Sequence, residues 1–302
     1  MSNVVEAELI NAEFFINSIS IRYELQTKKP QIKVDSNLGA KYNKKDLYYD
    51  PDDMSINISG LLILKYFESK NLIELEQTRN AFLWGIAHEF FHHGRNHIAV
   101  WNHYGIKQTD NSSKQVQILR FLEDDSDTLA TAALYRHFLN NVYKDSDSYS
   151  IKLKVLATLF KIIRLKILAH KSEPLIHPAW RTRLYSQMIK LSELDNIFNN
   201  PLNSKERITK STNAQRDMLL GELIKLEKGY SDNSDLTDYY LKPVDYPKEI
   251  ASSDKITLRK SGSYYAQVGL DLYYLNESHK ELEVILRKNC NLPGLNVAKH
   301  QI

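Results

Sequence analysis

The polar and apolar positions divide the chain into an early part with strand-like alternation and a longer part with helical spacing. Residues 19–25 and 31–36 alternate apolar and polar side chains, and residues 54–59 follow a turn at 48–53. From about residue 61, apolar side chains recur every three or four positions, which predicts helices. The pattern therefore predicts an α+β, mostly helical fold in which a small N-terminal β-sheet packs on a helical core.

The helical spacing predicts where individual helices begin and end. The expected helices cover about residues 74–94, 114–143, 151–170, 179–194 and 214–229. Gly94 and the polar residues after it end the first of these, and Pro174 and Pro178 interrupt the chain before the helix at 179. The basic helix at 151–170 is expected to be amphipathic and packed on the body of the protein. Residues 264–276 fit either a strand or a helix.

A change in composition near residue 200 suggests a domain boundary. Residues 1–199 are expected to form one domain, strand-rich over 1–60 and helical over 61–199. Residues 200–302 form a C-terminal region of unknown role, with substrate selection as one candidate. The polar segment 199–213 at its start is typical of a linker or a surface loop.

Composition excludes several classes of protein. The chain has 302 residues and a net charge of +3, too small a charge to indicate a nucleic acid or a membrane surface as partner. A single cysteine, Cys290, excludes an internal disulfide and a cysteine-ligated zinc site. The N-terminus lacks the pattern of a signal peptide, and no apolar run reaches the roughly 18 residues of a membrane span. A cytoplasmic protein is therefore expected.

The segment "AHEFFHH" at 87–93 carries the pattern H-E-x-x-H inside a predicted helix. His88 and His92 are four residues apart, so both imidazoles project from one face and can bind a single zinc ion. Glu89 can then act as a general base beside the open coordination position. The alternative is a solvated pair of histidines, but the surrounding residues are apolar, and a buried polar group needs a partner such as a metal.

A catalytic zinc site needs a third protein ligand. Glu123 is the only glutamate between Glu89 and residue 173, and it borders the apolar stripe of the next long helix. Asp127 lies on the same helical face and could accept a hydrogen bond from a ligand histidine. Glu123 is therefore the predicted third ligand, with Asp125 as the substitute and Asp124 as a solvated residue.

Two further histidines are close enough in sequence to compete for the metal. His93 points about 100° away from His92 on a helix, so it cannot share the same ion. His97 follows His92 by five residues, whereas the metzincin arrangement needs six, and no later methionine turn is visible. Both are expected to lie on the surface or to support a ligand from behind it.

With these residues in place, the chain resembles the gluzincin metallopeptidases. The motifs "HEFFH", "EDDSD" and "HPAWRTRL" follow one another at 88–92, 123–127 and 177–184. This order is similar to that of the HtpX and CAAX prenyl proteases and, more closely, to that of the Lit peptidase, a bacterial phage-exclusion protease. The resemblance covers residues 80–190 and implies a zincin-like core, with the H-E-x-x-H motif on one helix and the glutamate ligand on the next.

The resemblance also implies roles for individual residues. His88, His92 and Glu123 would bind zinc, Glu89 would be the base, and Asp127 would support the ligands. His177 could stabilise the oxyanion of the reaction, or it could simply begin a helix together with Pro178. Arg183 would anchor that helix by pairing with an acidic residue near the site, or it would form an ordinary ion pair.

The resulting prediction is a zinc-dependent, cytoplasmic endopeptidase of narrow specificity, with a peptide trigger as a candidate activator. The resemblance implies elongation factor Tu as a candidate protein substrate. Two other classes stay open: a regulatory or binding module with a structural zinc ion, and a metal-free helical interaction protein. An intact Glu89 favours the enzyme over the first, and the later motifs favour it over the second.

Overall fold

The chain folds into two compact units, each described here by itself. The computed structural model describes residues 3–35, 47–59, 72–106, 113–169, 180–194, 205–231 and 264–295. One unit comprises residues 1–105 and 283–302, and the other comprises residues 106–282. The chain thus passes between units at 105–106 and 282–283, because its last segment returns to the first unit. The domain boundary near residue 200 stays a prediction.

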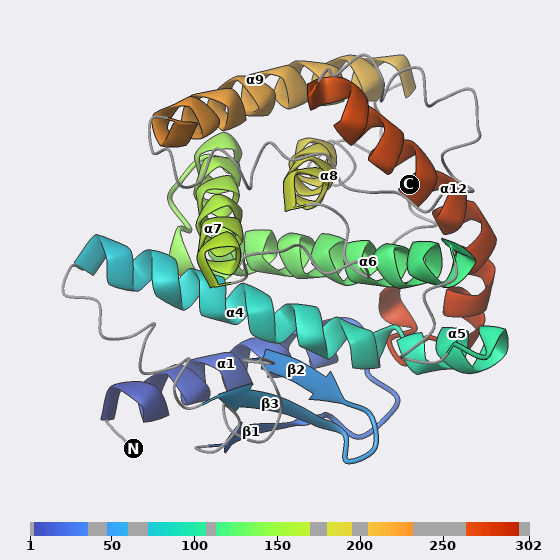
Figure 1. Cartoon of the computed structure of the whole chain (residues 1–302). Coiled ribbons are helices and arrows are strands. Elements are labelled where there is room, and N and C mark those ends of the chain that lie inside the picture. Colours follow the sequence, from blue (N-terminus) through green and yellow to red (C-terminus); the bar gives the residue numbers. More distant parts are fainter. Residues whose placement is uncertain are drawn as a thin grey trace. The chain divides into compact units, whose positions relative to one another are not determined.

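In its described parts, the first unit combines helices with a small sheet (Figure 1). Its elements are α1 (Asn3–Arg22), β1 (Gln31–Asp35), β2 (Leu47–Asp50), β3 (Ser55–Ser59), α4 (Leu72–Gly94) and α5 (His97–Tyr104). Helix α4 packs against α1, β2 and β3. The buried face of α4 includes Phe82, Ile86 and Phe90, which recur at helical spacing.

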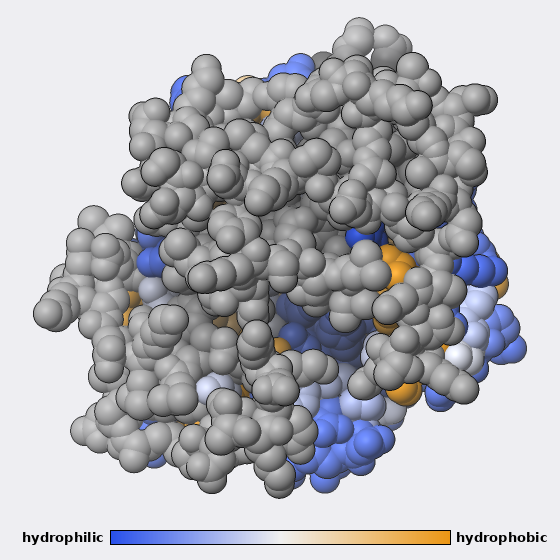
Figure 2. Space-filling model, viewed as in Figure 1, coloured by the Kyte–Doolittle hydropathy of each residue, from blue (hydrophilic) through white to orange (hydrophobic). Residues whose placement is uncertain are grey.

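The three strands form a mixed sheet in the order β1–β3–β2. Strand β1 runs parallel to β3, and β2 runs antiparallel to it with Tyr49 opposite Ile56. Every residue of β3 is buried. The turn at 51–54 between β2 and β3 is exposed, and its surface is hydrophilic in Figure 2. The strands predicted at 31–36 and 54–59 are confirmed, and β2 is an addition at the edge of the sheet.

The start of the chain is a helix, so the strand predicted at 19–25 and the strand-rich character of the first 22 residues are wrong. Ala12, Phe15, Ile16 and Ile19 are buried, with exposed fractions of 3% or less. These positions follow the spacing of a helix, not the alternation of a strand. The alternation seen at 19–25 falls on the last turn of α1 and the residues after it, where few positions remain to distinguish the two periods.

The second unit is helical in all the parts that the structure describes. Its elements are α6 (Ser113–His137), the π-helical turn η1 (Phe138–Val142), α7 (Ser148–Ala169), α8 (Trp180–Glu193), α9 (Lys205–Ser231) and the larger part of α12 (Tyr264–Asn289). Helix α8 packs against α6, α7 and α9 (Figure 1). The mostly helical α+β class is thus confirmed.

The helix predictions hold in this unit, with shifted ends. Helix α6 stops at His137 and gives way to η1, so the predicted helix to residue 143 contains a π-helical turn. Helix α9 begins at Lys205, inside the segment predicted as a linker, and residues 264–276 are helical. The apolar segment at 61–70 lies outside the described residues.

Helix α7 is amphipathic, as predicted for the basic segment. Ile151, Val155, Leu156 and Leu159 are buried at helical spacing. None of the helices in the described parts of the chain has the length and apolar character that crossing a membrane requires.

One lysine of α7 is buried within this unit. Lys152 is fully buried, and its ammonium group donates to the backbone carbonyl of Leu194, just after α8, at 2.6 Å. A second bond goes to the side-chain oxygen of Gln215 on α9. A buried charge is costly unless such partners satisfy it. Lys152 therefore links α7 to the end of α8 and to α9.

Replacing Lys152 is expected to destabilise the second unit. Lys152→Met keeps most of the side-chain volume but leaves buried acceptors without a donor, at a cost of roughly 1–3 kcal/mol each in unfolding free energy. Lys154→Met is the control, because Lys154 is exposed and its ammonium group lies over the Tyr143 ring. Urea denaturation of both variants measures the difference. Equal losses of stability would contradict the role given to Lys152.

Candidate metal centre

Two histidines of α4 are arranged as ligands of one ion. His88 and His92 are one helical turn apart, and their Nε2 atoms lie 3.2 Å from each other. Two nitrogen ligands of a tetrahedral zinc ion, with Zn–N bonds of about 2.0–2.1 Å, lie about 3.3–3.4 Å apart. The ring of Trp84 stacks on His88 at 5.5 Å between centroids, and His88 is buried. The pair is therefore held by packing in a geometry that fits zinc.

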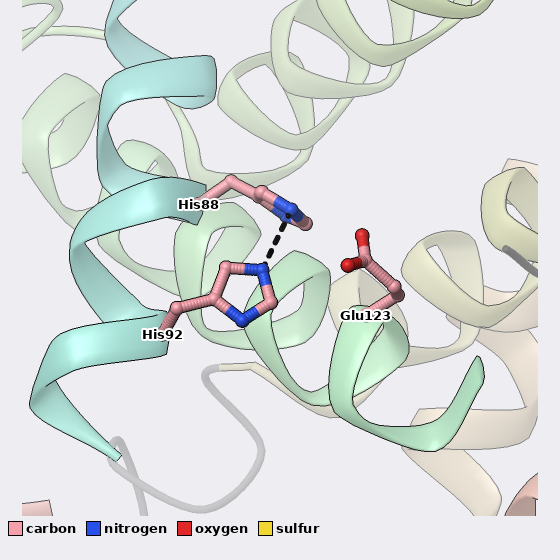
Figure 3. A group of neighbouring side chains, drawn as sticks. All are labelled: His88, His92 and Glu123. Atoms are coloured by element: carbon pink, nitrogen blue, oxygen red, sulfur yellow. Dashed lines mark hydrogen bonds between the residues drawn. The ribbon is translucent and has the colours of Figure 1, made fainter. Parts of the chain in front are cut away.

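Among the described residues, Glu123 of α6 is grouped with His88 and His92 as a residue that could hold a metal ion. One ligand atom each from His88, His92 and Glu123 can be chosen so that all lie within 4.8 Å of one another. Figure 3 shows the carboxylate of Glu123 directed toward the two imidazoles. Two neutral imidazoles and one carboxylate form the donor set of a catalytic zinc ion, in which a fourth position takes water. The residues present thus fit the metal.

Glu89 is held beside the histidine pair by the edge strand of the sheet. Its Oε2 accepts a hydrogen bond from the backbone N–H of Tyr49 in β2, at 2.8 Å. Its Oε1 lies 4.0 Å from Nε2 of His88, the nitrogen that faces His92. The hydrogen bond at Oε2 thus orients the carboxylate, while Oε1 faces the side of the helix that carries His88 and His92. Nothing in the local sequence indicated the Tyr49 contact.

His93 faces away from the pair and is buried, so the surface alternative is wrong for it. Its Nδ1 lies 2.8 Å from the hydroxyl of Tyr49, and its Nε2 lies 2.8 Å from the hydroxyl of Thr27. Burial lowers the pKa of His93 to about 4, although a hydrogen bond with the backbone of Lys28 acts in the opposite direction. His93 is thus a neutral imidazole that joins α4 to β2 and to the loop after α1.

His97 is also buried, and it contacts a candidate ligand. Its Nδ1 lies 2.8 Å from Nδ1 of His92, and the two rings are nearly perpendicular. Of the two predicted alternatives for His97, the surface position is wrong. The ring of His97 lies instead against that of His92, and a role in supporting a metal ligand stays a prediction. His103, on the same helix, is exposed, as expected.

The end of α4 is held by the C-terminal segment of the chain. The backbone N–H of Asn291 donates to the carbonyl of Gly94, and its side-chain amide donates to the carbonyl of His93. A Cβ atom at Gly94 would meet the side chain of Leu292 at 2.4 Å, so any larger residue there would force the Leu292 side chain to move. This support of the ligand helix could not be read from residues nearly two hundred positions apart.

Arg183 pairs with Asp127 inside the second unit. The guanidinium donates from Nε to Oδ2 at 2.6 Å and from Nη2 to Oδ1 at 2.7 Å, and both side chains are buried. Burial by itself would lower the pKa of Arg183, but the charge and hydrogen bonds of Asp127 raise it, so the guanidinium stays charged. Both carboxylate oxygens of Asp127 accept from Arg183, and its support of a ligand histidine stays a prediction.

Two other acidic residues of α6, Asp124 and Asp125, lie next to Glu123 in sequence, and Asp124 is less exposed than predicted. Asp124 is half-buried instead of solvated, and burial raises its pKa to about 7 despite a hydrogen bond from Ser186. Asp125, the substitute ligand, is buried and is not part of the three-residue group found among the described residues. His177 lies outside the described residues.

Comparison of the chain with protein-family models, with curated proteins and with solved structures gives no match.

Proposed function

We propose that this protein is a zinc-dependent endopeptidase of the gluzincin type, with a zincin-like core built on α4 and α6. The observation that carries the proposal is the geometry of the H-E-x-x-H motif. The metal-facing nitrogens of His88 and His92 lie 3.2 Å apart, and the Glu89 carboxylate is fixed beside them by Tyr49. Glu123 is proposed as the third ligand.

The chemistry follows from this donor set. Zinc bound there would lower the pKa of its water toward neutrality and polarise the carbonyl of a peptide bond. Glu89 accepts the proton of the attacking water and later gives it to the leaving nitrogen. The hydrogen bond from Tyr49 holds the carboxylate in place for both transfers.

A structural zinc site is the competing proposal, and the position of Glu89 disfavours it. Structural zinc sites usually take four protein ligands, whereas the group found in the described residues has three. A base oriented beside the remaining position has a use in hydrolysis and none in a closed site.

The substrate and location extend the proposal. The resemblance of the three motifs makes elongation factor Tu the first protein substrate to test, with and without a phage peptide as trigger. Because elongation factor Tu works in the cytoplasm, we also propose a cytoplasmic location for the protease. Narrow specificity is expected, since an unselective protease would damage its own cell.

The test is zinc content by elemental analysis, after purification without chelators. We expect about one zinc per chain in the wild type and in His103→Ala, because His103 is an exposed histidine outside the centre. His92→Ala and Glu123→Ala should lose stoichiometric zinc while circular dichroism shows that they remain folded. A wild type without zinc would overturn the proposal, and zinc retained in Glu123→Ala would remove Glu123 from the ligand set.

A further inference from the structure

The candidate ligand His92 makes a contact at each of its two ring nitrogens. Its Nε2 faces Nε2 of His88 at 3.2 Å, and its Nδ1 lies 2.8 Å from Nδ1 of His97. The two nitrogens point in different directions from one ring. An ion held by His88 and His92 therefore lies on the far side of the His92 ring from His97, and His97 cannot bind the same ion.

When His92 binds a metal, only one arrangement of ring protons is consistent with the 2.8 Å distance between Nδ1 of His92 and Nδ1 of His97. The lone pair of the ligand must then be on Nε2 of His92, so its proton is on Nδ1. That Nδ1–H donates to Nδ1 of His97, which must be the acceptor. His97 in turn carries its own proton on Nε2.

The backbone places His97 behind His92 through a short, well-held connection. Only Arg95 and Asn96 separate α4 from α5, and Asn96 adopts the left-handed conformation with φ 55°. Its side-chain amide donates to the carbonyl of Asn289 at 3.0 Å. Arg95 is buried, and its guanidinium donates to Glu283 at 2.8 Å. Both partners lie at the end of α12, which thus holds the turn that returns the chain to His92.

We propose that His97 is a positioning residue that sets the tautomer and ring orientation of the zinc ligand His92. The inference rests on the proposed function, since it concerns the same metal. Ligand histidines usually donate to a carboxylate, a carbonyl or water. Here the acceptor is a buried, neutral imidazole, so the support adds no negative charge. The ligand group keeps the single negative charge of Glu123.

Three substitutions separate positioning from simple packing. His97→Asn puts an amide oxygen close to the place of Nδ1, so it keeps an acceptor for His92. His97→Gln puts the oxygen near the place of Nε2, and His97→Leu has no acceptor. The control is His103→Leu, an exposed position on the same helix.

The measurement is zinc affinity of the full chain, by competition with a chromophoric chelator. Weakening of about 10- to 100-fold is expected for His97→Leu and His97→Gln, the range found when such supporting partners are removed. His97→Asn and His103→Leu should stay close to the wild type. The visible absorption of the cobalt-substituted protein should change in His97→Leu and His97→Gln and be restored in His97→Asn. If His97→Leu fails to fold, the zinc affinities of His97→Asn and His97→Gln are compared instead, and that comparison tests the proposal.

The outcomes are distinct for the two proposals. A wild type that binds no zinc overturns the proposed function and this inference with it. Tight zinc binding by the wild type and equally by Leu and Gln variants overturns only the inference. Equal weakening in all three His97 variants, Asn included, also overturns it, because the acceptor at Nδ1 would then not be what matters.

Discussion

Glu89→Gln is expected to reduce peptide hydrolysis by about 10²- to 10⁴-fold, the usual contribution of a general base, while zinc content stays at the wild-type level. Glutamine preserves the size of the side chain, and its amide oxygen can still accept from the backbone N–H of Tyr49. What it lacks is the ability to take a proton from water. The measurement is cleavage of purified elongation factor Tu and of a mixed peptide library, read by mass spectrometry alongside elemental analysis.

The control for this prediction is Glu76→Gln, an exposed glutamate on the same helix. It should cleave and bind zinc like the wild type. Full activity in Glu89→Gln would exclude Glu89 as the base. Loss of zinc together with activity would mean that Glu89 holds the metal, which would change the ligand set instead of the mechanism.

Asp127→Asn is expected to lower the unfolding free energy by about 3–5 kcal/mol, the cost of breaking a buried ion pair from one side. The substitution keeps the shape of the side chain but removes the carboxylate charge that accepts two hydrogen bonds from the buried guanidinium of Arg183. The bidentate geometry, with bonds of 2.6 and 2.7 Å, makes the pair a strong polar link between α6 and α8. Urea denaturation followed by circular dichroism measures the loss.

The matched control for the ion pair is Glu222→Gln, which breaks an exposed pair with Lys225 on α9. Exposed pairs contribute little, so this variant should unfold like the wild type. The double variant Asp127→Leu, Arg183→Leu should recover much of the stability lost in Asp127→Asn, because no unpaired charge remains. A loss in Asp127→Asn no larger than that of the control would show that the pair is not structurally important.

The elements that could be predicted from the sequence are those set by local spacing. The apolar period predicted α4 and its end at Gly94, and the strands at 31–35 and 55–59 followed from alternation. The pairing of His88 with His92 is also local, since residues four apart share a helical face. The first 22 residues show the limit of this reasoning, because a short alternating segment was preferred over a helical pattern that continued into it.

Contacts between residues far apart in the chain could not be predicted and became visible only in the folded protein. Tyr49 orients Glu89 across 40 positions, Arg183 pairs with Asp127 across 56, and Asn291 holds the end of α4 across 198. A hydrogen bond depends on distance and direction in space, and neither follows from a local period. Local spacing was therefore enough to predict the helix that carries His88, Glu89 and His92. The folded chain decided which groups orient the base and which imidazole supports His92.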